Sequence, residues 1–246
     1  MSFSRIAKVY DRFNDLETYE QWLDFTLSAV NQQPKKVLDV ACGTGWFTSL
    51  LAPFVGEITG MDIDEEMLAI ARREDPEQVV MYRQGDMLAM TAYPTDYDLV
   101  TCYADSLCFL DNPQQVQRAI QQMLERLTPG GTLLFDVWTP YQVTTGFDNF
   151  SYFDSDETAA LLWDSVVDVE SQSVEHYLTV FVRTDDNRYE RDEVVLTEHA
   201  HPLSVYQAAF EQSGVASVEV FVNFGESYYD EAQHQTADRW FFRVVK

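Results

Sequence analysis

Residues 36–48 combine a short apolar run, two glycines and a second apolar run, an arrangement that can hold a small ligand. Gly43 and Gly45 can adopt positive φ angles, which lets the backbone approach a ligand closely. A helix that begins just after Gly45 would add unpaired N–H groups. A Gly-x-Gly pair alone is a weak signal, because any tight strand-to-helix turn can produce it. The prediction of a ligand loop therefore depends on the strands and acidic residues downstream of it.

Two carboxylates come after the loop, at the ends of predicted strands. Asp62 ends the strand 57–62, about twenty residues after the loop, the interval at which a Rossmann-like half places a carboxylate on ribose hydroxyls. Asp62 could instead cap the next helix, a role for which Asp64 is equally placed. Asp86 follows the strand 79–83, where a loop carboxylate could accept a hydrogen bond from an adenine amino group. Asp86 could instead be an Asx-turn residue, whose side chain bonds to its own loop backbone.

Two more predicted strands complete this half of the chain. The strand 97–102 breaks into residues 103–106, and the strand 131–137 follows a Thr-Pro-Gly turn. Strands and helices alternate to about residue 140, which predicts an open α/β sheet. Ligands bind such sheets outside the carboxyl ends of the parallel strands. We therefore expect the loop, Asp62 and Asp86 to face one site.

Residues 38–45 resemble the first motif of the class I S-adenosylmethionine-dependent methyltransferases, and residues 35–140 are similar to that family as a whole. The carboxyl-terminal segments 202–213, 216–221 and 238–244 resemble its last helix and last two strands. The resemblance implies a doubly wound, Rossmann-like α/β fold. Its sheet would have seven strands in the order 3-2-1-4-5-7-6, with strand 7 antiparallel. The cofactor implied is S-adenosyl-L-methionine.

The amino-terminal segments 4–13 and 19–22 resemble a bacterial subgroup that includes YqeM-like proteins and amino-sugar N-methyltransferases. In that subgroup the tyrosine equivalent to Tyr10 caps the cofactor site. Some of these sugar enzymes carry a histidine shortly after the fourth strand, where this chain has Phe109. A base cannot be carried over from the subgroup at that position, and the catalytic residue stays unassigned.

The resemblance and the spacing together predict the cofactor-contacting residues. Asp39 could contact the ligand or stabilise the loop, and Cys42 is more readily a packing residue than a nucleophile. The full predicted set is Tyr10, Asp39, Ala41, Cys42, Gly43, Gly45, Asp62, Ile63, Met67, Gly85, Asp86, Met87, Tyr103, Ala104 and Asp105.

After residue 140 the alternation of predicted strands and helices stops, and extended strands follow one another. Residues 161–170, 174–183 and 189–199 read as antiparallel strands, which we interpret as a lid over the acceptor site or a surface for a homodimer. Residues 1–140 and 202–246 would form the cofactor-binding core, and residues 141–201 the insertion. Four histidines lie in or after the insertion and read as ordinary strand or surface residues: His176, His199, His201 and His234. Candidate acceptor-pocket aromatics are Tyr141, Tyr152, Trp163, Tyr228 and Tyr229.

Composition bounds the partners. The formal net charge of −25 opposes general binding to nucleic acids and anionic membranes, since long-range repulsion hinders encounter. The three cysteines have no metal-ligand spacing, which predicts neither a metal site nor a disulfide framework. There is no signal-peptide core and no long apolar run, so we expect a cytoplasmic protein.

The predicted activity is methyl transfer from S-adenosylmethionine to nitrogen or oxygen of a small-molecule acceptor. One alternative is a non-catalytic protein or partner subunit that binds S-adenosylmethionine or S-adenosylhomocysteine, with no acceptor pocket. Another is a nucleotide-dependent oxidoreductase. That fingerprint needs a third glycine, and Thr48 stands at its position.

Overall fold

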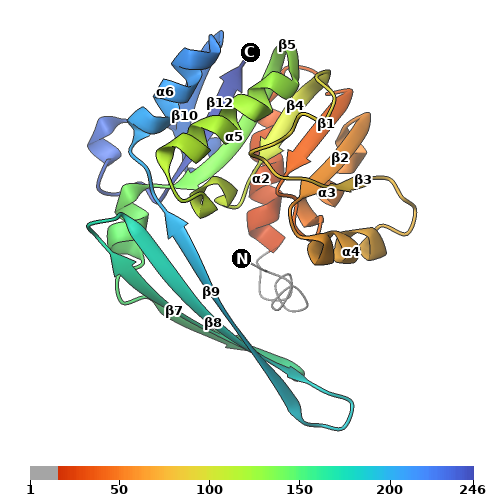
Figure 1. Cartoon of the computed structure of the whole chain (residues 1–246), viewed down its shortest axis with the longest axis vertical. Helices are drawn as coiled ribbons and strands as arrows, with labels where there is room; N and C mark the ends of the chain where they lie inside the picture. Colours follow the sequence, from red (N-terminus) through yellow and green to blue (C-terminus); the bar gives the residue numbers. More distant parts are fainter. Residues whose placement is uncertain (1–15) are drawn as a thin grey trace.

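The centre of the molecule is a sheet whose strands are buried on both faces. The structure, a computed structural model, describes residues 16–246. Five parallel strands pair in the order β3-β2-β1-β4-β5 (Figure 1). Their bounds are Lys36–Val40 for β1, Glu57–Asp62 for β2, Met81–Gln84 for β3, Tyr97–Cys102 for β4 and Leu127–Trp138 for β5. Burial on both faces explains the near-continuous apolar runs of the central strands β1 and β4, whereas the edge strand β3 is largely exposed.

Three strands near the carboxyl terminus extend this sheet beyond β5. β12 (Arg239–Val245) is antiparallel to β5, and β10 (Ser217–Val222) is antiparallel to β12. The predicted order and the antiparallel seventh strand are therefore confirmed. β11 (Ser227–Tyr228) adds an eighth strand at the edge, which was not predicted.

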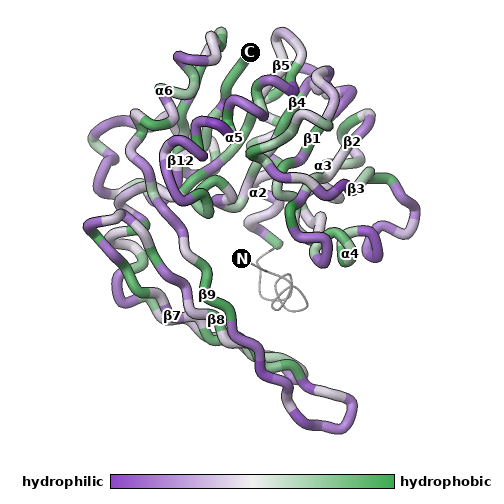
Figure 2. Tube along the Cα trace, viewed as in Figure 1, coloured by the Kyte–Doolittle hydropathy of each residue, from purple (hydrophilic) through white to green (hydrophobic). Residues whose placement is uncertain are grey.

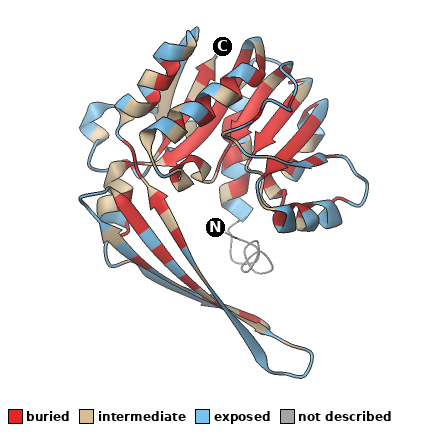
Figure 3. Cartoon of the chain, in the orientation of Figure 1, coloured by how far each residue is buried: buried red, intermediate tan, exposed pale blue. Residues whose placement is uncertain are grey.

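Helices cover both faces of the sheet, whose central strands are buried (Figure 3), and they pack on it through apolar side chains. α2 (Leu16–Ala29), α3 (Trp46–Leu51) and α4 (Glu65–Glu74) pack on one face, and α5 (Pro113–Arg126) and α6 (Leu203–Ser213) pack on the other. The remaining short turns are η1 (Ala52–Phe54), η2 (Ser106–Phe109), the π-helix η3 (Gln142–Gly146), η4 (Asn223–Gly225) and η5 (Glu231–Gln233).

The helix ends have local causes. The Asp64 carboxylate accepts a hydrogen bond from Glu66 N at 2.9 Å and caps α4, which leaves Asp62 free of that role. Asn112 caps α5 in the same way, with Pro113 at the first helical position. Gly214 ends α6 in the left-handed conformation, with φ of 63°.

The inserted segment forms a second, antiparallel sheet that projects from the central one (Figure 1). Its strands are β6 (Ser151–Ser155), β7 (Ala159–Asp168), β8 (Ser173–Arg183) and β9 (Tyr189–His199), of which β6 was not predicted. Near the core, its apolar residues pack against Phe109 and Trp138. At its far end, the tip of the β8–β9 hairpin is hydrophilic (Figure 2).

The composition led to expectations about disulfide bonds and about membrane-spanning helices. Cys42, Cys102 and Cys108 are free thiols. Between residues 16 and 246, no helix has the length and apolar content that crossing a bilayer requires.

Candidate functional site

The larger of two adjoining pockets lies where β1, β2 and β4 end, and its volume is about 440 Å³. It is at the carboxyl edge of the parallel strands, where open α/β sheets bind ligands. The structure brings most of the predicted cofactor residues together around it: Asp39, Ala41, Cys42, Gly43, Asp62, Ile63, Met67, Gly85, Asp86, Met87, Tyr103 and Ala104. A Cβ atom added at Gly43 would meet no atom within 4 Å, so the loop backbone faces open space.

The other predicted residues lie elsewhere. Gly45 does not line the pocket. It precedes α3 with φ of 82°, and an added Cβ would come within 2.3 Å of the Tyr82 hydroxyl. Asp105 lines a smaller adjoining cavity. Tyr10 lies outside the described residues, so its predicted contact stays a prediction.

Asp62 ties the glycine loop to the end of β2. Its Oδ2 accepts a hydrogen bond from Gly43 N, and its Oδ1 accepts one from Asp64 N, both at 2.8 Å. Burial raises the pKa of this carboxyl group. A carboxylate oxygen can accept two hydrogen bonds, so each oxygen retains capacity for a ligand hydroxyl.

Asp39 connects β1 to α3 and β4 from beneath the loop. It is 2 % exposed, and its two oxygens accept hydrogen bonds from Thr48 Oγ1 at 2.5 Å and Thr101 Oγ1 at 2.7 Å. Burial raises the pKa of Asp39 to about 6, and the two threonine hydroxyls oppose the shift. Asp39 therefore stabilises the loop and also lines the pocket, so both roles weighed from the sequence stay open.

The pKa of Asp39 predicts a dependence of stability on pH. Because the folded-state pKa is raised, the contribution of protonated Asp39 is complete below about pH 4 and is lost as pH rises through about 6. From pH 5 to pH 8 we expect this group alone to lower the free energy of unfolding by about 1.5 kcal/mol. Urea unfolding at several pH values, with wild type and Asp39→Asn, measures it.

The Asp39→Asn variant should flatten that part of the profile without removing it, because burial also raises the pKa of Asp62 and Glu198. Asp96 is an exposed carboxylate on the surface, so Asp96→Asn should retain the wild-type slope. An Asp39→Asn profile as steep as that of wild type would contradict the assignment.

A smaller cavity of about 210 Å³ adjoins the first pocket, and the second sheet forms one of its walls. Tyr19, Trp22, Ala104 and Phe109 line both spaces. From the core come Thr18, Asp105, Trp138 and Arg239, and from the inserted segment come Phe147, Trp163, His176, Leu178, Leu196 and Glu198. The cavity is thus walled mainly by aromatic and apolar side chains, with a few ionisable groups.

The guanidinium group of Arg239 lines this cavity and forms ion pairs with two carboxylates. Its Nη2 donates to Asp105 Oδ1 at 2.6 Å, and its Nη1 donates to the fully buried Asp136. The guanidinium carbon lies 3.6 Å from the ring centroid of Trp138 and 5.7 Å from that of Trp22. The planar fork and two aromatic faces fix the position of the charge.

His176 and Glu198 lie on neighbouring strands of the second sheet and face this cavity. His176 Nδ1 accepts from the indole N–H of Trp163 at 3.0 Å and is 2.8 Å from Ser165 Oγ. Burial lowers the pKa of His176 to about 4. Glu198 is 5 % exposed, and its Oε2 lies 3.8 Å from His176 Nε2. Burial, then the charge of Asp105, raises the pKa of Glu198.

Sequence reasoning missed most of this second cavity. Arg239, Glu198 and Trp138 were not singled out, and His176 was treated as an ordinary strand histidine. Of the candidate pocket aromatics only Trp163 lines the cavity. No local motif marks these residues, because strands far apart in the sequence bring them together.

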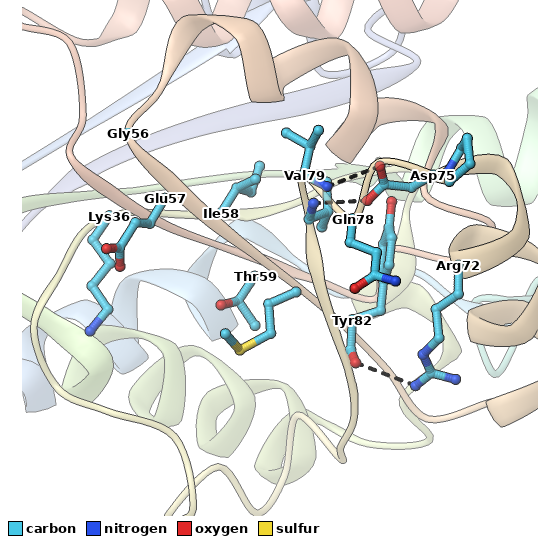
Figure 4. A pocket seen from close by; sticks show the side chains of 13 residues that line it. Lys36, Gly56, Glu57, Ile58, Thr59, Arg72, Asp75, Gln78, Val79 and Tyr82 are labelled. Atoms are coloured by element: carbon cyan, nitrogen blue, oxygen red, sulfur yellow. Dashed lines mark hydrogen bonds between the residues drawn. The ribbon is translucent and has the colours of Figure 1, made fainter.

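A third hollow, of about 630 Å³, lies at the edge formed by β2 and β3 (Figure 4). Lys36 and Glu57 begin their strands there, so this hollow is at the opposite end from the ligand edge. Its polar groups satisfy one another: Asp75 accepts from Val79 N and Val80 N, and Arg72 donates to Tyr82 O. Nothing in this arrangement calls for a ligand.

Comparisons with known proteins agree with the geometry. A family described as "Methyltransferase domain" matches residues 37–131. A protein of Geobacillus sp. (strain WCH70) is 31 % identical over 252 residues, which cover both chains completely. YqeM of Bacillus subtilis (strain 168) is 28 % identical over 247 residues, covering 100 % of this chain and 98 % of its own. Both relatives are described as a "putative methyltransferase".

Two solved structures share the fold. An S-adenosylmethionine-dependent methyltransferase from Clostridium acetobutylicum ATCC 824 has a TM-score of 0.82 at 21 % identity, covering 99 % of this chain and 97 % of that one. An amino pentose methyltransferase from Micromonospora echinaspora with S-adenosylmethionine bound has a TM-score of 0.73 at 21 % identity, covering 96 % and 93 %.

Proposed function

The chain belongs to the class I S-adenosylmethionine-dependent methyltransferases, and we propose that its acceptor is the amine nitrogen of a small molecule held in the 210 Å³ cavity. The cavity adjoins the larger pocket and shares Trp22 and Phe109 with it. This position suits an acceptor that must meet the methyl group of a cofactor bound next door.

We assign the larger pocket to the cofactor. Asp62 is the ligand for the ribose hydroxyls, Asp86 for the adenine amino group, and Ala41 and Gly43 flank the methionine end. The free capacity of the Asp62 oxygens and the open space at Gly43 support this fit. When bound, S-adenosylmethionine supplies a methyl group on a cationic sulfur, already activated for attack. The protein's task is then mainly to orient the acceptor and exclude water.

The charge around the smaller cavity is the observation that carries the amine assignment. Asp105 and Glu198 both face it, whereas Arg239, the one guanidinium among the described residues that line it, is already paired with Asp105 and Asp136. Among the described residues, carboxyl groups therefore outnumber cations there, and the Trp163 ring also favours a cationic guest. An ammonium group suits this environment better than a neutral hydroxyl. The amino pentose methyltransferase of similar fold is a further reason to test amines.

The inserted sheet has a role in this proposal. Residues 141–201 form a lid on the acceptor, and residues 1–140 with 202–246 form the core that holds the cofactor. His176, Leu196 and Glu198 are among the lid residues that form the cavity wall. A lid that covers the acceptor keeps the reacting atoms dry and aligned.

The non-catalytic alternative predicts a cofactor pocket without an acceptor cavity. The 210 Å³ cavity beside the larger pocket counts against that alternative. Membership of the methyltransferase family removes the reason for the oxidoreductase alternative.

A matched pair of probes tests the acceptor class. Purified protein with S-adenosylmethionine is offered cyclohexylamine or cyclohexanol, and formation of S-adenosylhomocysteine is followed by chromatography. We expect turnover with the amine to exceed turnover with the alcohol by at least about tenfold, since only the ammonium gains from the carboxyl groups. A panel of small amines and their matched alcohols extends the comparison. Turnover that favours the alcohols across the panel would overturn the amine proposal.

A further inference from the structure

We propose that Glu198 of the lid binds the acceptor's ammonium group and removes its proton before methyl transfer. The inference rests on the proposed amine acceptor and identifies the group that makes the amine nucleophilic. It assigns the base to the inserted sheet, not to the core that holds the predicted cofactor residues.

The position of Glu198 is the first support. It lies near the end of β9, lines the cavity and is 5 % exposed. Within residues 16–246, its Oε2 accepts no hydrogen bond. A buried carboxyl oxygen without a partner is costly, and the cost is removed when a donor binds. An ammonium group in the cavity would be such a donor.

The nearby histidine cannot easily serve as the base instead. An indole N–H only donates, so the bond from Trp163 fixes the lone pair of His176 on Nδ1. The neutral ring then carries its proton on Nε2, which lies 3.8 Å from Glu198 Oε2. His176 is therefore assigned as a positioning residue beside the Glu198 carboxyl group.

The charges around Glu198 favour a carboxyl group that holds a proton well. Asp105, at the start of η2, adds negative charge, while Arg239 on β12 is divided between Asp105 and Asp136. His176 faces Glu198 from β8. The thiol of Cys108 is close enough to interact electrostatically with Glu198. Burial and Asp105 together raise the pKa of Glu198, which brings its proton affinity closer to that of an amine.

The proton and electron balance is simple. Glu198 first releases its own proton to solvent as the amine enters as R–NH₃⁺. One N–H bond then breaks as the ammonium proton moves to Oε2 of the ionised Glu198, which leaves R–NH₂ with a free lone pair. That lone pair forms the N–C bond to the methyl group, and the electrons of the C–S bond go to sulfur. The product leaves as R–NH₂–CH₃⁺, and Glu198 returns its proton to solvent.

Glu198→Gln tests this assignment, because glutamine keeps the size of the side chain and cannot take a proton. Glu190→Gln is the matched control, since Glu190 is an exposed residue of the same strand. For each protein we would measure S-adenosylhomocysteine affinity, binding of cyclohexylamine to the S-adenosylhomocysteine-saturated protein by calorimetry, and the pH profile of amine methylation.

The expected result is specific to the acceptor side. Glu198→Gln should retain S-adenosylhomocysteine affinity within about twofold, bind the amine at least about tenfold more weakly, and lose about 10²–10⁴ in kcat. Its remaining rate should rise about tenfold per pH unit, following the fraction of amine that is already neutral. The wild-type rate should depend on pH less steeply, and Glu190→Gln should match wild type.

The contrary outcomes separate the two proposals. Amine methylation by Glu198→Gln at the wild-type rate and with the wild-type pH profile would overturn the role of Glu198 and leave the amine acceptor standing. Equal losses of cofactor affinity and amine turnover would also overturn it, because the effect would then be structural. Wild-type protein that neither binds nor methylates amines would overturn the amine acceptor itself, and this inference with it.

Discussion

Replacing Asp62 with alanine is expected to weaken S-adenosylhomocysteine binding by about two to three orders of magnitude. Two effects combine: the assigned ribose ligand is lost, and Gly43 N loses the acceptor that holds the glycine loop in place. Hydrogen bonds to a charged group contribute roughly 1.5–3 kcal/mol each, and about 1.4 kcal/mol corresponds to a factor of ten. Isothermal titration calorimetry of wild type and variant measures the difference.

Asp98 offers a matched control at the opposite end of the sheet. Its carboxylate also accepts from two backbone N–H groups, those of Lys35 and Lys36, at 2.9 and 3.1 Å. Asp98→Ala therefore breaks the same kind of contacts without touching the pocket. We expect Asp98→Ala to keep its affinity for S-adenosylhomocysteine within about threefold. Equal affinities of Asp62→Ala and wild type would refute the ribose assignment, and equal losses in both variants would point to general destabilisation.

The residues of the larger pocket could be grouped from the sequence because their signals are local in the chain. The glycine loop, Asp62 and Asp86 each follow a strand directly, and parallel strands end at one edge of the sheet. Knowing the strand ends was therefore enough to group these residues, and they line one pocket. The family, its cofactor and the strand order were also predicted and are confirmed.

The acceptor half could not be predicted, because its contacts are long-range. Asp105 and Arg239 meet across 134 residues of sequence, and Glu198 reaches them from a separate sheet. A period-two pattern shows that alternate residues of a strand share a face, but not what that face will meet. His176 was thus indistinguishable from any strand histidine.

The differences between the predicted and the observed strands also have physical reasons. β6 is exposed along its whole length, so it lacks the apolar alternation that marks a strand. The predicted strand 79–83 begins late, at Met81, because the Asp75 carboxylate binds the backbone N–H groups of Val79 and Val80. A side chain therefore satisfies donors that a strand would have used in its ladder.

Replacing Arg239 with methionine is expected to lower the free energy of unfolding by about 3–5 kcal/mol. Methionine keeps an apolar stem against Trp138 but removes the charge, which leaves Asp136 fully buried without its cation and Asp105 without its partner. Loss of one member of a buried ion pair is costly because the remaining charge is not solvated. Urea unfolding at pH 7, followed by circular dichroism, measures the change.

Two further variants locate the cause of that loss. Arg243 lies on the same strand and pairs with Glu219, but both side chains are partly exposed, at 22 % and 28 %. Arg243→Met should therefore cost only about 1 kcal/mol. Adding Asp136→Asn to Arg239→Met should restore part of the lost stability, because the stranded charge is removed. If Arg239→Met cost no more than Arg243→Met, or if Asp136→Asn restored nothing, burial of the Asp136 charge could not be the reason that Arg239 stabilises the fold.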